Sequence, residues 1–239
     1  MRRLLPDGKD EYKLGSIIRN LVLAATAVLL LGACSTIEKI TGEDKDKNPD
    51  QLMQDGLSYM NRGLYENAFE AFQDIRDRYP YSRHAITAEL KIADALYKRG
   101  NYDQAHEAYD DFEKLHPKNK NIPYVIYQKG MCDFAQIKTI DREQVHTLKA
   151  KATFERLIRQ FPKSEYAIRA RKNLRKCIVY LAEYEIYVGN FYHKMGFYRA
   201  ALGRYNYILQ NYPDMGQYHE AMENIREIKE KLAIEVIED

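Results

Sequence analysis

Apolar and small residues recur at one fixed spacing ahead of the prolines of this chain. Counted back from three different prolines, a Gly stands at position −17, an Ala at −12 and an aromatic residue at −8. The three sets are Gly63, Ala68, Phe72 and Pro80; Gly100, Ala105, Tyr109 and Pro117; and Gly196, Ala201, Tyr205 and Pro213. Around Pro162 only Ala150 and Phe154 fit the spacing. Because Gly suits the positive φ that ends a helix and Pro cannot continue one, each set predicts a turn, an amphipathic helix and a stop.

A second small residue stands at position −24 relative to three of these prolines, as Gly56, Ala93 and Gly189. A small side chain there lets two helices pack closely. Small, aromatic and Pro positions at these offsets resemble the tetratricopeptide (TPR) pattern, a helix-turn-helix unit of about 34 residues. We therefore expect an all-α fold, a superhelical solenoid of about five TPR helix pairs over residues 49–239. A generic helical bundle with accidental spacing is the alternative.

The ends of the first helices follow from capping residues and prolines. Asn48 and Gln51 predict a capping box around Pro49, which suits the first helical position. Ser82 is the expected cap of the third helix. The expected helices cover residues 49–62, 66–79, 84–99 and 102–116.

The third unit opens at residue 121 and is longer than the others. The interval from Pro117 to Pro162 is 45 residues, against 37 for the previous interval. We place the extra residues in a loop at 138–146, which is polar and has no apolar period. A long loop on a rigid scaffold is a site for function, and an idle surface insertion fits equally well.

One long helix is expected next, because no Pro occurs between Ser164 and Met195. Its first half is basic, and Arg169, Arg171, Lys172 and Arg175 are the residues that we assign to an acidic partner. A solvated face with scattered Glu is the alternative for them. Its second half carries an aromatic stripe, Tyr180, Tyr184, Tyr187 and Phe191, spaced by four, three and four residues. We expect this stripe to pack against neighbouring repeats. A last helix begins at residue 214 or 217 and closes the solenoid.

The start of the chain resembles a bacterial lipoprotein precursor. Residues 21–31 form an apolar run that is too short to cross a bilayer, so residues 1–33 are expected to be a signal peptide that is removed. Leu31, Gly32, Ala33 and Cys34 resemble a lipobox, which implies acylation at Cys34 and a flexible tether at residues 34–48. An ordinary secretory signal with a chance Cys is the alternative. The resemblance also implies an anchor on the periplasmic face of the outer membrane, since no Asp follows Cys34.

Composition excludes some functions. The net charge of +2 comes from the predicted signal peptide, so the rest of the chain is neutral and offers no electrostatic footprint for nucleic acid. We find no zinc helix, phosphate loop or nucleophile elbow, and we expect no enzyme activity, no cofactor and no metal. Cys132 and Cys177 lie on different predicted helices; a disulfide is possible in an oxidising compartment, but two buried thiols are favoured.

Beyond the repeats, the details resemble the BamD family, the lipoproteins of the machinery that inserts β-barrel proteins into the bacterial outer membrane. The resemblance lies in the Arg-Tyr-Pro at 78–80, the segments 115–130 and 161–166, the Tyr-rich stretch 184–192, and Asn-Tyr-Pro-Asp at 211–214. It implies that residues 49–120 recognise unfolded outer-membrane proteins, and that residues 121–239 dock on the central barrel component. It assigns Tyr79 to substrate and Arg204 to a partner carboxylate, although Tyr79 fits inter-repeat packing equally well. A different envelope TPR lipoprotein, such as a secretin pilot or a cell-wall or division coordinator, is the alternative.

Overall fold

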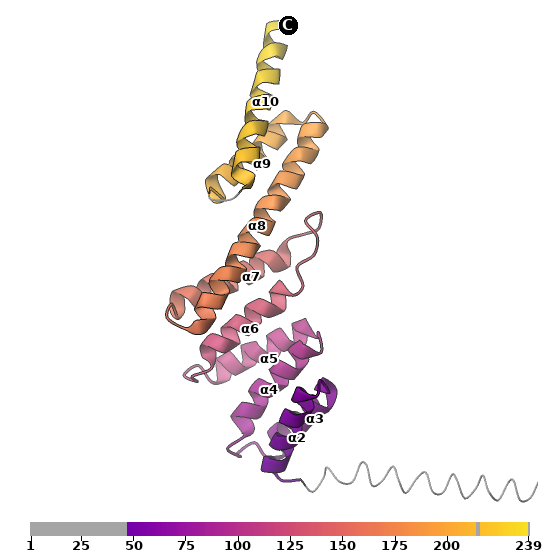
Figure 1. The fold of residues 1–239 in the computed structure, drawn as a ribbon, viewed down its shortest axis with the longest axis vertical. Helices are drawn as coiled ribbons and strands as arrows, with labels where there is room; N and C mark the ends of the chain where they lie inside the picture. Colours follow the sequence, from indigo (N-terminus) through magenta and orange to yellow (C-terminus); the bar gives the residue numbers. More distant parts are fainter. Residues whose placement is uncertain (1–46, 214–215, 239) are drawn as a thin grey trace, which may run out of the picture. The chain divides into compact units, whose positions relative to one another are not determined.

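Nine α-helices fill the part of the chain that the computed structural model describes, residues 47–213 and 216–238 (Figure 1). They are α2 (Pro49–Asn61), α3 (Tyr65–Arg78), α4 (Ala85–Lys98), α5 (Tyr102–Leu115), α6 (Ile122–Phe134), α7 (Val145–Gln160), α8 (Glu165–Lys194), α9 (Tyr198–Asn211) and α10 (Gln217–Glu238). The chain divides into two units, residues 1–51 and 52–239. In the second unit each helix packs on the next one along the chain, as in a solenoid of TPR helix pairs. The predicted all-α solenoid is confirmed.

Glycine and proline set the helix ends as expected. Gly63, Gly100 and Gly196 end the first helices of their pairs with φ of 76°, 83° and 78°. The capping box is also present, because the amides of Asn48 and Gln51 each accept the other's backbone N–H as a hydrogen bond of 3.0 Å.

The predicted cap at Ser82 is wrong. α4 begins three residues later, at Ala85, and the Ser82 hydroxyl is buried with no hydrogen-bond partner in the described part of the chain. The reason is that residues 82–85 form a tight backbone turn, in which the Ala85 N–H bonds to the Ser82 carbonyl at 3.1 Å. The side chain therefore does not reach the helix N–H groups.

The core consists of the repeat positions. The Ala and aromatic residues of all four sets are fully buried: Ala68, Ala105, Ala150, Ala201, Phe72, Tyr109, Phe154 and Tyr205 each expose 0%. A Cβ atom placed on Gly56 or Gly189 would lie 2.5 Å from the ring of Phe72 or Tyr205, so only Gly permits this contact. Gly130 meets Phe154 at the same distance. Gly130 was not among the predicted positions, because the inserted residues move it to position −32 relative to its Pro.

The insertion is an ordered loop at residues 135–144, close to the predicted one. The Gln144 side chain holds it, donating to the Arg142 carbonyl at 2.8 Å and accepting from the Thr147 hydroxyl at 2.7 Å. No function for this loop follows from these contacts.

The long helix is confirmed as α8, with 30 residues and a length of about 45 Å. It joins two hydrophobic clusters, the first reaching Cys177 and the second beginning at Leu181. Ser164 caps it by accepting the Ala167 N–H at 3.0 Å. α8 therefore contributes buried residues to both clusters.

Candidate functional site

Tyr79 occupies a position that the fold repeats four times, the last residue before the Pro that ends a helix pair. His116, Phe161 and Tyr212 are its equivalents, and all four have φ of −126° to −134° and ψ of 50° to 58°. The Pro that follows each of these residues disfavours the helical region for it, so the helix ends there. Tyr79 packs half-buried on the first cluster, with the Arg78 guanidinium 5.4 Å from its ring centre. The geometry thus supports the packing role, and substrate contact stays a prediction.

Tyr81, two residues further, is fully exposed, with a relative accessibility of 101%. The sequence patterns assign no role to this residue. Tyr81 therefore offers an accessible aromatic ring two residues after Tyr79 in the chain.

Arg204 finds its carboxylate inside the chain. From α9 its Nη1 atom donates to Glu185 Oε2 on α8 at 3.0 Å, and this hydrogen bond raises the pKa of the guanidinium. Glu185 exposes 13% of its side chain and Arg204 exposes 41%. Arg204 is therefore a half-exposed cation, and any partner carboxylate would share it with Glu185.

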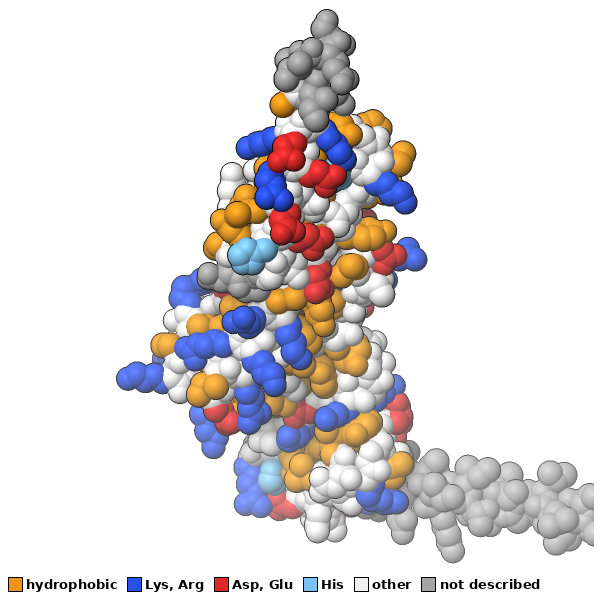
Figure 2. All heavy atoms as spheres, turned by 45° about the horizontal axis from the view of Figure 1, so that its top comes forward, with side chains coloured by type: hydrophobic (Ala, Val, Ile, Leu, Met, Phe, Trp, Pro, Cys, Tyr) orange, Lys and Arg blue, Asp and Glu red, His pale blue; other side chains and the backbone are white. Residues whose placement is uncertain are grey.

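The four basic residues assigned to an acidic partner all lie on the first half of α8: Arg169, Arg171, Lys172 and Arg175. Two of them make local contacts. Arg169 pairs with Glu165 at 2.9 Å, and Arg171 donates to the Pro162 carbonyl at 3.2 Å. Figure 2 shows Lys and Arg side chains gathered on the middle of one face of the molecule. The binding role of these four residues stays a prediction.

The aromatic stripe of α8 does not pack as expected. Tyr180 and Tyr184 are half-buried, but Tyr187 exposes 47% and Phe191 exposes 55%. The buried side of this half of α8 is formed by Leu181, Ala182, Ile186 and Gly189, which face the second cluster. The expectation of packing between repeats is wrong for Tyr187 and Phe191.

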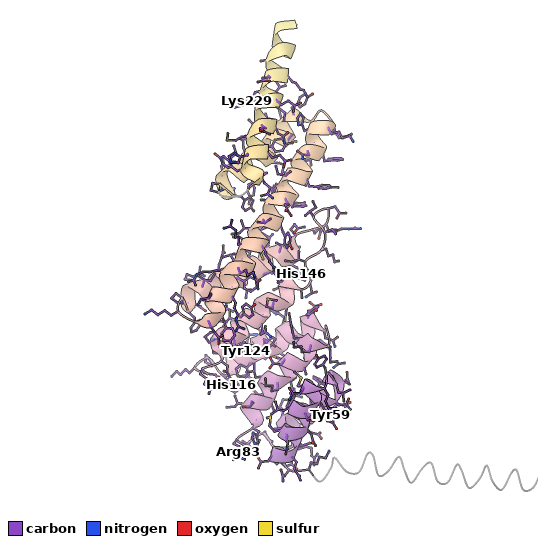
Figure 3. The ribbon with its side chains drawn as sticks, in the orientation of Figure 1. Tyr59, Arg83, His116, Tyr124, His146 and Lys229 are labelled. Carbon is purple, nitrogen blue, oxygen red and sulfur yellow. The ribbon has the colours of Figure 1, made fainter. Side chains whose placement is uncertain are left out.

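A buried carboxylate organises the junction of α4, α5 and α6. Asp94 exposes 6% and accepts the hydroxyls of Tyr109 at 2.7 Å and Tyr124 at 2.6 Å, while Lys91 pairs with its second oxygen at 2.7 Å (Tyr124 is labelled in Figure 3). Gln128 donates to both hydroxyls, at 3.4 and 3.2 Å. Burial and then the nearby Asp94 charge raise the pKa of both tyrosines. The network joins two repeats, and its tyrosines stay protonated at neutral pH.

The same network recurs at the same sequence offsets near the C-terminus. Asn190 accepts the Tyr205 hydroxyl at 2.7 Å and the Asn224 amide at 3.2 Å, and it donates to Glu220 at 3.1 Å. These partners lie 15, 34 and 30 residues after Asn190, as Tyr109, Gln128 and Tyr124 lie after Asp94. Burial raises the pKa of Tyr205 to about 12, with Glu220 adding to the shift. Here the network borders an open cavity of about 640 Å³ between α8, α9 and α10.

In the other two repeats, the position of Asp94 and Asn190 holds an apolar residue, and the aromatic residue is Phe. These apolar residues are Leu57, after Gly56, and Met131, after Gly130; the aromatic residues of their repeats are Phe72 and Phe154. A hydroxyl in those two cores would find no carboxylate or amide oxygen at the corresponding position of the preceding helix to accept its hydrogen bond. The choice of Phe or Tyr is therefore set by the partner on the preceding helix.

A second charged cluster joins α5, α6 and α7. Lys129, which exposes 6%, pairs with Asp110 and lies 3.1 Å from Glu113, and Arg156 binds both Glu113 oxygens at 2.6 and 3.0 Å. Hydrogen bonds from Lys114 and Lys129 lower the pKa of Asp110 to about 2. Each charged side chain in this cluster lies next to at least one of opposite sign, as in a structural ion network.

Asp133 is a further buried carboxylate. It exposes 5% and lies 3.2 Å from His146 and 3.8 Å from His106, beside a cavity of about 360 Å³ (His146 is labelled in Figure 3). Burial lowers the pKa of His106, and the Asp133 charge opposes this shift. Within residues 47–213 and 216–238, no group of three or more His, Cys, Asp or Glu side chains is arranged to hold a metal ion.

Cys132 and Cys177 are both buried as free thiols, as favoured from the sequence, and burial raises the pKa of each to about 12. They are therefore poor nucleophiles at neutral pH. None of the helices in the described part of the chain has an apolar stretch of the length that a membrane span requires. Cys34, the signal peptide and most of the tether lie outside the described residues.

Comparisons with known proteins agree with the sequence features. A family model described as YfiO, outer membrane lipoprotein, matches residues 45–239. Outer membrane protein assembly factors BamD are similar to this chain: that of Neisseria meningitidis serogroup A is 28% identical over 91% of this chain and 82% of its own length. That of Vibrio cholerae is 24% identical over 87% and 89%.

Solved TPR structures are also similar to this chain. The TPR2AB domain of yeast Sti1, in a complex with pHSP90, is 16% identical, with a TM-score of 0.45 over 77% of this chain and 70% of its own. A TPR protein of Thermus thermophilus is 16% identical, with a TM-score of 0.41 over 74% and 99%.

Proposed function

Because this chain belongs to the YfiO family of outer membrane lipoproteins, we propose that it is an outer-membrane protein assembly factor, a scaffold without enzyme activity that holds unfolded β-barrel proteins and the central barrel component of the assembly machinery together. The match over residues 45–239 is the observation that carries this proposal. The relatives named BamD are similar to this chain over 82% and 89% of their own length.

The described residues suit a scaffold. The polar side chains of the Asp94, Asn190 and Lys129 networks bind one another, so they hold repeats together. The exposed features are instead aromatic and cationic side chains, the residue types that dominate protein interfaces.

The anchor is part of the proposal. Acyl chains on Cys34 would hold the protein at the periplasmic face of the outer membrane, since more than one chain is needed for stable attachment. Replacing Cys34 by Ala should abolish incorporation of a labelled fatty acid and release the protein from washed membranes. Retention of the label in Cys34→Ala would refute this assignment.

We further propose that the two halves of the solenoid divide the work. Residues 49–120, with Tyr79 and the exposed Tyr81, receive the unfolded protein, and residues 121–239, with Arg204 and the basic residues of α8, dock on the barrel component. Tyr79→Ala and Phe161→Ala remove equivalent ring positions of the fold, so they form a matched pair. Binding of an unfolded β-barrel protein should weaken in Tyr79→Ala and Tyr81→Ala but not in Phe161→Ala, at equal thermal stability. Equal binding by all three would exclude Tyr79 and Tyr81 as the binding site.

Depletion of the protein tests the function as a whole. The expected result is a general loss of folded β-barrel proteins from the outer membrane, read from heat-modifiable migration in gels. Normal β-barrel levels with a defect in one secretin, or in septation alone, would favour the alternative of a secretin pilot or division coordinator.

A further inference from the structure

The exposed aromatic residues of α8 continue a helix face that is buried in other first helices of the stack. The reference is the small residue of the repeat pattern in each first helix, Ala93 in α4 and Gly130 in α6. This face consists of the residues five positions before it, one position before it and two positions after it. In α4 and α6 they are Ala88, Ile92 and Ala95, and Val125, Lys129 and Cys132. All six expose 6% or less, and the helices that carry them pack on α3 and α5, the second helices of the preceding pairs.

In the second half of α8 the same three positions hold Tyr184, Val188 and Phe191. Tyr184 and Val188 are only half-buried, and Phe191 exposes 55%. The neighbours Tyr187 and Met195 expose 47% and 56%. We call the set formed by Tyr184, Tyr187, Val188 and Phe191, together with Met195 directly after the helix, the open face of α8.

The open face exists because α8 is longer than the helix that packs on it. Ala170, Leu174 and Cys177 form the first part of the same face, with spacings of four and three, and they pack in the first cluster together with α7. α7 has 16 residues and α8 has 30, so about 21 Å of α8 extends past the end of α7. The covering helix ends, and the apolar face continues.

The corresponding face of α2 looks different. In α2, which has no preceding helix among the described residues, the three positions are Gln51, Asp55 and Ser58. Polar residues are what a solvated end of a solenoid requires. Tyr184, Val188 and Phe191 instead match covered positions, and contiguous exposed apolar side chains of this kind mark an interaction site.

We infer that the open face of α8 is a docking surface for one amphipathic helix of a partner protein, which packs on it as α7 packs on the first half of α8. A helix is the occupant because the face keeps helix-packing spacing and continues a helix-helix interface.

The N-terminal tether of this chain fits the surface poorly. The segment 35–48 contains only two large apolar residues, Ile37 and Ile40, in a run of polar and charged ones. It cannot offer an apolar stripe that matches about three turns of helix.

The open face would be the docking element for the partner in the proposed function, and it depends on that proposal only for the existence of a partner.

The test places a photo-crosslinking amino acid at Phe191, and separately at Val188, in the full-length chain in its own membranes. Ile168 is the matched control position, since it exposes 64% on α8 but lies off the open face. Crosslinked peptides are identified by mass spectrometry.

The expected result is a crosslink from positions 188 and 191 to a helical segment of another protein, with apolar residues spaced by three and four, at a yield at least about tenfold above position 168. In a second measurement, Phe191→Glu should lower the crosslink yield from position 188 about tenfold, as for loss of a central aromatic anchor, with an unchanged melting temperature. Crosslinks to residues 34–48, to a second copy of this chain or to an extended segment, or a yield equal to that of position 168, would overturn the inference.

The two proposals fail separately. A crosslink to a partner helix together with normal β-barrel levels after depletion would remove the proposed function and leave the docking surface. Defective β-barrel assembly without a crosslink would remove the docking surface and leave the proposed function.

Discussion

Replacing Gly130 by Ala should destabilise the protein although Ala is the better helix former. A Cβ on Gly130 would lie 2.5 Å from Phe154 Cε1 and 2.8 Å from Cδ1, where about 3.5 to 4.0 Å is the contact distance. Phe154 exposes 0%, and the rings of Tyr127 and Phe134 lie 6.0 and 6.2 Å from it, so the ring has no free space to enter. The added methyl group therefore forces a backbone shift.

Two opposing effects set the magnitude. Overpacking a tight core costs about 1 to 3 kcal/mol, and Gly to Ala in a helix returns about 1 kcal/mol. We expect a net loss of about 1 kcal/mol, which lowers the melting temperature by about 2 to 4 °C in a chain of this length. Gly203 in α9 is the matched control, because a Cβ there meets nothing within 4 Å. Gly203→Ala should raise the stability by up to about 1 kcal/mol.

The assay is urea and thermal unfolding followed by circular dichroism, with both variants beside the unchanged protein. In a Phe154→Leu background the ring is gone, and Gly130→Ala should then cost nothing, as expected for residues in direct contact. If Gly130→Ala were as stable as Gly203→Ala, the close approach of α6 and α7 at this residue, and the repeat position derived from it, would be wrong.

Three further outcomes are expected. Asp94→Leu should cost about 2 to 4 kcal/mol by leaving two tyrosine hydroxyls without an acceptor, and the double variant with Tyr109→Phe should recover part of this loss in urea unfolding; no recovery would contradict the pairing. Because the folded pKa of Asp110 is depressed to about 2 from 3.8, its stabilisation is present above about pH 4 and lost as the pH falls towards 2. Asp110→Asn should therefore flatten acid unfolding over that window by about 1 kcal/mol after allowance for solvent, and an unchanged acid profile would refute it. Arg204→Ala should lower stability by about 1 kcal/mol and Arg204→Ala with Glu185→Gln by less; equal losses in a thermal melt would show that the pair is not coupled.

The repeat positions were predictable because they depend on local rules. Gly at a positive φ, Pro at a stop and a small residue opposite an aromatic ring are properties of single residues, so a fixed spacing measured from each Pro found them. The spacing failed at Gly130, where eight inserted residues lie between the small residue and its ring. Measuring from the helix starts would have found it, since Asn121 and Pro123 mark where α6 begins.

The choice of residues in the polar networks had a signal in the sequence that we did not use. Asp94 and Tyr109 have the same separation in the chain as Asn190 and Tyr205, while the other two aromatic repeat positions are Phe. A polar residue followed at this fixed separation by Tyr is visible in the sequence. Its meaning depends on tertiary contact, since the hydroxyl needs an acceptor only once both helices are packed.

The site residues were the least predictable part. Arg204 is paired with Glu185, a carboxylate that the sequence does not assign to it. The pairing across α8 and α9 depends on the angle between two helices, and spacing within one helix does not give it.

The open face of α8 and the length of α8 have the same cause, the absence of a helix-ending Pro between Ser164 and Met195. α4 and α6 each begin after a Pro and a turn, and the helix before that turn folds back and covers them. Between Ser164 and Met195 there is no Pro, so the chain passes from the first cluster to the second without folding back, and no covering helix is made for residues 184–195. If the apolar side chains there served only the fold, the polar pattern of Gln51, Asp55 and Ser58 would serve it better. Their aromatic character is therefore explained by a partner and not by the stability of this chain alone.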